Sequence, residues 1–77
     1  MADELRNKLK VQRAMHDLTQ ADLAAKAGVT RKSVNAIETG RMVPSVLLAL
    51  KLARALDVPI ETIFILDNSH VDTIEES

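Results

Sequence analysis

The chain has 77 residues, of which 47% are hydrophobic, 27% are charged and none is cysteine. This length and balance predict one small globular domain, and the lack of cysteine excludes a disulfide scaffold and any thiolate metal site. No apolar run approaches the ~18 residues of a membrane span, and no signal segment opens the chain. Two glycines are too few for a phosphate-cradling loop. We therefore expect no membrane partner, and the reducing cytoplasm fits the composition.

The net charge of −1 conceals a strong division of charge along the chain. Residues 1–54 hold all ten Lys and Arg against five acids, a balance of +5. Residues 55–77 hold six acids and no base, a balance of −6. Such an asymmetry favours a polyanionic partner for the basic part, although ordinary solvated surface charge explains it equally well.

The first element is predicted to be a helix over residues 3–16. Leu5 and Leu9 recur at helical spacing, and Asp3 and Glu4 suit the positive N-terminal end of a helix. This helix would supply the first apolar face of the core.

The next two helices are predicted over residues 20–27 and 31–39. Thr19 opens the first with a capping-box pattern, and Gly28 ends it where a positive φ is needed. Thr30 is a good N-cap for the second.

A fourth helix is predicted over residues 46–56, with Ser45 as its N-cap. Its apolar stripe is assigned to the core and consists of Val46, Leu47, Leu50, Ala53 and Leu56. Pro59 then fits the first turn of a short fifth helix. Beyond it, the turn signal at residues 67–69 predicts a hairpin or a lone strand, and an acidic frayed tail fits equally well.

The tight connection between the second and third helices predicts a steep crossing, the helix-turn-helix geometry. Ala24 supplies the small side chain needed where the helices touch. Val34 and Ile37 are predicted to turn inward, with Leu23 and Val29 completing the contact.

At 100° per residue, the opposite face of the third helix is polar or small. It carries Arg31, Lys32, Asn35, Ala36 and Thr39. Arg and Lys suit guanine O6 and N7, Asn suits adenine N6 and N7, and Ala suits a thymine methyl. A merely solvated helix would show the same face, so the face alone leaves both interpretations open.

The segment from residue 19 to residue 40 resembles the helix-turn-helix domains of phage Cro and repressor proteins, the xenobiotic response element (XRE) family. The resemblance continues through residues 44–64 and covers residues 4–66. It implies an all-α, compact five-helix bundle of the lambda-repressor-like type, with the motif at helices two and three. We expect a DNA-binding domain over residues 1–66 and an acidic tail over residues 67–77, which either frays or forms a dimerisation strand.

The resemblance also implies roles for individual residues. Base reading falls to Arg31, Lys32 and Asn35, with Ala36 and Thr39 beside them. Phosphate contacts fall to Gln20, which in some relatives also reaches a base, and to Thr30, Ser33 and Arg41. Arg13 and Glu38 match a structural ion pair, so Glu38 is not interpreted as a catalytic acid. His16 and His70 have no partners at metal-ligand spacing, and we expect no metal, cofactor, small-molecule ligand or enzymatic activity.

The resemblance implies a transcriptional regulator that binds double-stranded DNA in a sequence-specific way. We expect it to act as a repressor and to be located in the cytoplasm, at the nucleoid. One module this small reads few base pairs, so we expect a homodimer on a palindromic operator. The expected dimer interface consists of Ile60, Ile63, Phe64, Ile65 and Leu66. The alternative is an antitoxin-like or anti-repressor module that binds a protein through its acidic tail.

Overall fold

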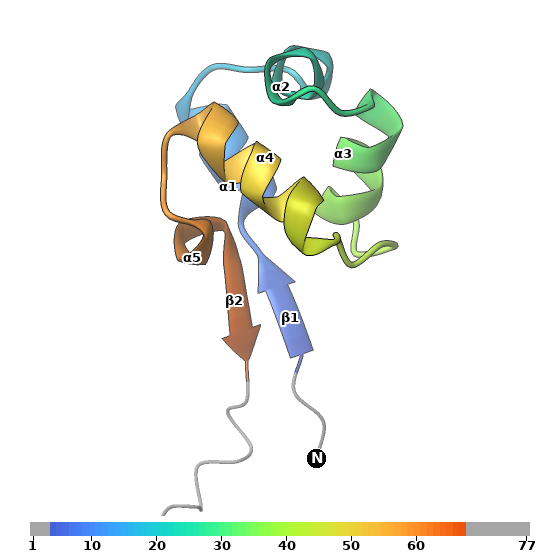
Figure 1. Ribbon diagram of the computed structural model, residues 1–77, viewed down its shortest axis with the longest axis vertical. Helices are drawn as coiled ribbons and strands as arrows, with labels where there is room; N and C mark the ends of the chain where they lie inside the picture. Colours follow the sequence, from blue (N-terminus) through green and yellow to red (C-terminus); the bar gives the residue numbers. More distant parts are fainter. Residues whose placement is uncertain (1–3, 68–77) are drawn as a thin grey trace, which may run out of the picture.

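The structure is a computed structural model that describes residues 4–67, and it folds them into five helices and a two-stranded antiparallel sheet. In chain order the elements are β1 (Glu4–Asn7), α1 (Leu9–Met15), α2 (Gln20–Ala27), α3 (Arg31–Glu38), α4 (Val46–Leu56), α5 (Ile60–Ile63) and β2 (Phe64–Asp67). The helices gather into one body, and the two strands project together from one end of it (Figure 1). The five predicted helices are present, but the all-α class is corrected to a mostly helical fold with a small sheet.

The N-terminal segment differs most from its prediction. Residues 4–7 form β1, and α1 begins only at Leu9, so the helix predicted over residues 3–16 is wrong over residues 4–8. Asp3 lies outside the described residues. A helix that started at residue 3 would leave β2 without its partner strand.

The two strands pair antiparallel, which places Leu5 opposite Leu66 and Arg6 opposite Ile65. The Arg6 guanidinium also forms an ion pair with the Asp67 carboxylate, two residues beyond Ile65 along β2. The predicted C-terminal strand is therefore present over residues 64–67, with the N-terminal segment as its partner. The predicted second arm of a hairpin and the rest of the acidic tail lie outside the described residues.

Asn7 marks the change from strand to helix. Its side-chain oxygen accepts a hydrogen bond from the backbone N–H of Leu9 (3.2 Å), and its amide donates to the carbonyl of Ile37 (3.0 Å). One side chain thus starts α1 and ties it to the end of α3. The Ile37 carbonyl, which lies near the end of α3 and lacks a partner within the helix, also accepts from the backbone N–H of Gly40 at 3.1 Å.

The three central helices begin where the sequence predicts, because each N-cap hydroxyl accepts a bond from a backbone amide of the first turn. Thr19 accepts from the N–H of Asp22, and Thr30 and Ser45 make the equivalent bonds at 3.0 and 3.1 Å. The ranges predicted for α2 and α4 are confirmed. That for α3 is confirmed to within one residue.

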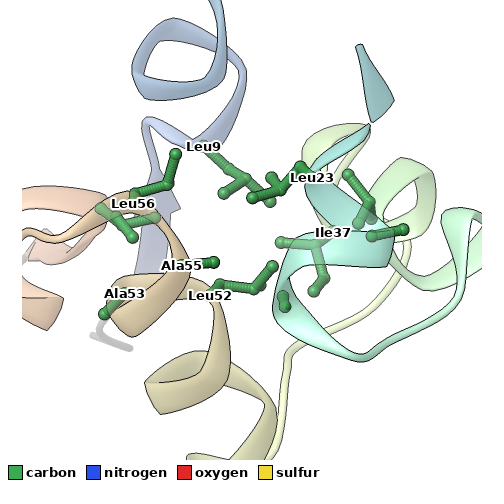
Figure 2. Packing of buried hydrophobic residues seen from close by; sticks show 11 residues of the cluster. Leu9, Leu23, Ile37, Leu52, Ala53, Ala55 and Leu56 are labelled. Carbon is green, nitrogen blue, oxygen red and sulfur yellow. The ribbon is translucent and has the colours of Figure 1, made fainter. Parts of the chain in front are cut away.

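The core is built by side chains from all five helices (Figure 2). Its largest fully buried members are Leu9, Leu23, Val34, Ile37, Leu52, Leu56 and Ile63. The prediction for the apolar stripe of α4 is partly wrong. Ala53 and Leu56 are buried as predicted, but Val46 is 74% exposed, Leu47 is 65% exposed and Leu50 is 50% exposed. Leu52, which lies outside the predicted stripe, is fully buried.

The helix-turn-helix contact follows its prediction closely. Leu23 and Ala24 of α2 are buried, as are Val34 and Ile37 of α3. Gly28 ends α2 with φ of 75°, and its backbone N–H donates to the carbonyl of Ala24 at 2.9 Å. The left-handed turn redirects the chain at once into α3.

Replacing Gly28 with alanine tests the cost of that turn. A Cβ at this position meets no atom within 4 Å, so the penalty comes from the backbone conformation alone. We expect Gly28→Ala to lower the free energy of unfolding by about 1–2 kcal/mol, measured by urea denaturation. Asp57 adopts the same conformation, with φ of 57°, so Asp57→Gly should leave stability equal or higher. Equal stability of the Gly28 variant and the parent would contradict this account.

Candidate nucleic-acid interface

The outward face of α3 gathers the cations that the sequence predicts there. Arg31 and Lys32 are exposed, Asn35 is half-buried, and the three side chains line an open hollow of about 350 Å³. Val34, on the opposite face of the helix, is fully buried. The core therefore fixes the rotation of α3, and with it the direction in which these polar groups point.

The two ends of α3 carry the remaining predicted contacts. At its start, the hydroxyl of Thr30 donates to that of Ser33 (2.9 Å), which leaves the Ser33 hydroxyl hydrogen for another acceptor. At its end, the backbone N–H of Arg41 donates to the carbonyl of Ala36 (2.8 Å) and holds the following loop against the helix. Thr39 is exposed beside that loop. All the predicted DNA-contact residues of α3 and its flanks thus lie on or beside one helix.

An ion pair locks α3 to α1. The Arg13 guanidinium donates to both carboxylate oxygens of Glu38, from Nε at 2.7 Å and from Nη2 at 3.1 Å. Its third nitrogen donates to the carbonyl of Leu18 (2.9 Å), just before α2. Only 3% of the Glu38 side chain is exposed. The structure therefore brings together the two residues for which the resemblance implied a structural pair.

Gln20, the first residue of α2, joins the same network. Its Nε2 donates to Glu38 Oε1 at 3.0 Å and to Asn35 Oδ1 at 3.2 Å. The resemblance implied that Gln20 contacts phosphate and in some relatives also a base, and it implied neither of these two bonds. Asn35 and Glu38 are three residues apart, so they are neighbours on one side of α3. The sequence does not show that this side meets the start of α2, and both bonds depend on that contact.

Opposing effects set the ionisation of Glu38. Burial raises the pKa of its carboxyl, but hydrogen bonds from Arg13 and Gln20 and the positive charges of Arg13 and Lys10 outweigh burial. The net result is a pKa below its ordinary value of 4.5. Glu38 is therefore ionised at neutral pH, and as an ionised group it only accepts hydrogen bonds.

The residues expected at a dimer interface differ in accessibility. Ile63 is fully buried in the core of its own chain, and Ile60 and Phe64 pack partly against that core. Ile65 is half-buried, and Leu66 is 61% exposed. Leu66 is thus the member of the set with a freely accessible apolar side chain, and it lies on the sheet opposite Leu5.

Residues 4–67 contain no group of three or more His, Asp or Glu that could hold a metal ion. None of the helices within this range has the length and apolar character needed to cross a membrane.

Two steeply joined helices, the second presenting cations outward, define a helix-turn-helix protein, and comparison with known proteins gives the family. The helix-turn-helix family model matches residues 9–63. An uncharacterised HTH-type transcriptional regulator of Methanocaldococcus jannaschii is 52% identical over 64 residues, covering 83% of this chain and 97% of the relative. A second one, from Bacillus subtilis, is 42% identical over 66 residues, covering 86% and 100%.

Solved structures agree with the sequence relatives. The restriction-modification controller protein C.AhdI from Aeromonas hydrophila is similar with a TM-score of 0.68 and 35% identity, over 70% of this chain and 82% of that one. The chain therefore belongs to the XRE-type helix-turn-helix family of transcriptional regulators.

The lowered pKa of Glu38 predicts that the folded protein loses stability in acid. Because its pKa is lower in the folded chain than in the unfolded one, its contribution to stability is complete above the ordinary value of 4.5 and is lost as the pH falls through the lower folded value. We expect urea denaturation to show stability falling as the pH drops below 4.5, and Glu38→Gln to be less stable at pH 7 but to fall less steeply.

Asp22, whose pKa its hydrogen bonds with Thr19 also lower, adds a decline of the same sign and is present in both proteins. It therefore serves as the internal reference for the comparison. Parallel pH profiles of the parent and Glu38→Gln would show that Glu38 makes no such contribution.

Proposed function

We propose that the chain is a sequence-specific regulator that binds double-stranded DNA by inserting α3 into the major groove. The observation that carries this proposal is the fixed outward face of α3, where Arg31, Lys32 and Asn35 line one hollow. A major groove about 12 Å wide admits a helix, and these residue types match the donors and acceptors on its base edges. Ala36 and Thr39 extend the same face.

The flanks of α3 support a contact with the DNA backbone. The free hydroxyl hydrogen of Ser33 and the exposed cation Arg41 sit at opposite ends of the helix, with Thr30 next to the first. Contacts of this kind set the register of a protein on the duplex, whereas base contacts select the sequence. Complex formation should accordingly weaken as salt is raised, because bound cations displace counterions.

The proposed mode of action is occupancy of a palindromic operator by a homodimer, at the nucleoid in the cytoplasm. One α3 covers few base pairs, and two copies one helical turn of DNA apart, roughly 34 Å, read a two-fold site. We take repression as the direction of regulation, since a protein that occupies promoter DNA blocks transcription without further machinery. The similar fold of a restriction-modification controller supports a regulator, and no catalytic activity is proposed.

For the dimer contact we propose the apolar face of the sheet. Leu66 is 61% exposed and lies directly opposite Leu5, which is 43% exposed, so the pair presents adjoining apolar surface. Ile65, on the neighbouring position of β2, is half-buried. A second apolar surface, on α4, is formed by the exposed side chains of Val46, Leu47 and Leu50, and it supplies the control for this assignment.

The antitoxin-like alternative rests on the acidic tail. Most of that tail lies outside the described residues, and the observations on α3 favour DNA as the partner.

The test of DNA reading compares two single cations. Arg31→Ala should cost about 1–3 kcal/mol on the cognate duplex, roughly 5- to 150-fold in Kd, and relax selectivity at one base position. Lys26→Ala removes a cation that is also exposed but lies on α2, away from the reading face, and should change Kd far less. Gel-shift titration on a duplex selected from random DNA measures both. Equal losses in the two variants, or no loss in either, would overturn the assigned face.

The test of the dimer contact uses matched charge insertions. Leu66→Glu places a carboxylate in the proposed interface and should shift the chain from dimer to monomer in analytical ultracentrifugation, while its thermal unfolding remains cooperative. Leu47→Glu places the same charge on the exposed surface of α4 and should leave the dimer intact. If Leu47→Glu became monomeric and Leu66→Glu stayed dimeric, the interface would lie on α4 instead. A parent chain that is monomeric would overturn the proposed dimer.

A further inference from the structure

The side chain of Gln20 is held in one orientation by two acceptors on α3. Its Nε2 lies 3.0 Å from Glu38 Oε1 and 3.2 Å from Asn35 Oδ1. The oxygen and nitrogen of an amide side chain look alike in shape, and their assignment depends on the partners. Here the partner is an ionised carboxylate that also accepts from Arg13, so the nitrogen of Gln20 must face it.

This orientation decides what Gln20 offers to the outside. An amide nitrogen carries two hydrogens, and its two acceptors are both within the protein, one for each hydrogen. The atom left over is Oε1, an acceptor. Phosphate oxygens are acceptors as well, so this state of Gln20 does not suit the phosphate contact that the resemblance implies. It suits an exocyclic amine, such as adenine N6 or cytosine N4.

The same bond orients Asn35 in the opposite sense. Its Oδ1 accepts from Gln20, which leaves the amide nitrogen, Nδ2, as the free donor. Asn35 lines the hollow on the reading face together with Arg31 and Lys32. A donor in this position suits the N7 acceptor of a purine. Gln20 thus takes one of the two lone pairs of Asn35 Oδ1, while no donor within residues 4–67 meets Gln20 Oε1, which is the more open acceptor of the two.

We propose that Gln20 and Asn35 form one composite base reader, in which Gln20 Oε1 accepts from an exocyclic amine and Asn35 Nδ2 donates to a purine N7. Adenine, with its N6 donor beside its N7 acceptor, is the base whose edge complements both atoms. Glu38 is the positioning residue: it holds the Gln20 amide without reaching DNA, since its side chain is 3% exposed. This inference rests on the proposed insertion of α3 into the major groove.

The test is a comparison of base preference at every operator position. The parent chain first selects its site from random duplex DNA, and gel-shift titrations then cover all single-base changes in one half-site. Gln20→Met keeps the length of the side chain but removes the amide. We expect it to lose about tenfold in discrimination at one base pair, or at two adjoining ones, and to keep the parent preference elsewhere.

Two further variants separate reading from folding. Asn35→Asp still accepts from Gln20 but replaces the outward donor with an acceptor, so preference should move from a purine N7 toward a base that donates, such as cytosine. Glu38→Gln introduces an amide that either donates or accepts, so Gln20 loses its fixed orientation. We expect Glu38→Gln to weaken base preference at the same operator position as Gln20→Met does. Lys26→Ala is the matched control with the parent profile, and thermal unfolding of each variant confirms that it is folded at the assay temperature.

The outcomes distinguish this inference from the function on which it rests. A uniform loss across all sequences in Gln20→Met would identify a phosphate contact and overturn the composite reader. A parent-like profile in that variant would overturn it as well. In both cases the parent still selects a sequence, and the proposed function stands. A parent chain that selects no sequence would overturn the proposed function and the inference together.

Discussion

The arrangement of the molecule depends on one carboxylate with almost no exposure to solvent. Glu38 is the last residue of α3, and it is bonded by Arg13 from α1 and by Gln20 from α2, so three helices meet at a single side chain. Buried ion pairs contribute little net stability, because desolvation offsets their attraction, but removing one partner leaves a costly unpaired charge. The pair therefore acts mainly as a geometric constraint. It penalises any arrangement in which α3 turns or slides relative to α1 and α2.

The elements that the sequence predicts well are those with local signals at both ends. Thr19 caps α2 and Gly28 ends it, and both signals act within four residues of the groups that they satisfy. The inward positions of α3 also follow from local periodicity, because Val34 and Ile37 are separated by three residues on one face. For the same reason its outward polar face, which carries Arg31, Lys32 and Asn35, could be predicted from the sequence, whereas the hollow that they line could not.

The features that escaped prediction depend on partners distant in the chain. Residues 4–7 become a strand only because residues 64–67 lie beside them, and neither segment carries a sequence signal that identifies its pairing partner. Val46 and Leu47 belong to an apolar stripe at helical spacing, but the spacing does not show whether that stripe faces the core or the solvent. The hydrogen bonds of Gln20 required knowing how closely α2 approaches α3. In each case the missing information was a distance between elements.

The sheet also has a consequence for the order in which the protein assembles. The ion-paired residues Arg6 and Asp67 are 61 positions apart, whereas the helix-turn-helix contacts lie within some twenty positions of one another. During synthesis the residues of β1 leave the ribosome first, and those of β2 follow only after all five helices have been synthesised. Contacts between distant segments form late, since a large loop must close first. Each new copy would therefore acquire the packed helix pair early and the Leu5–Leu66 surface last, so the dimer contact that we propose for this surface would form only after the remainder of the chain has folded.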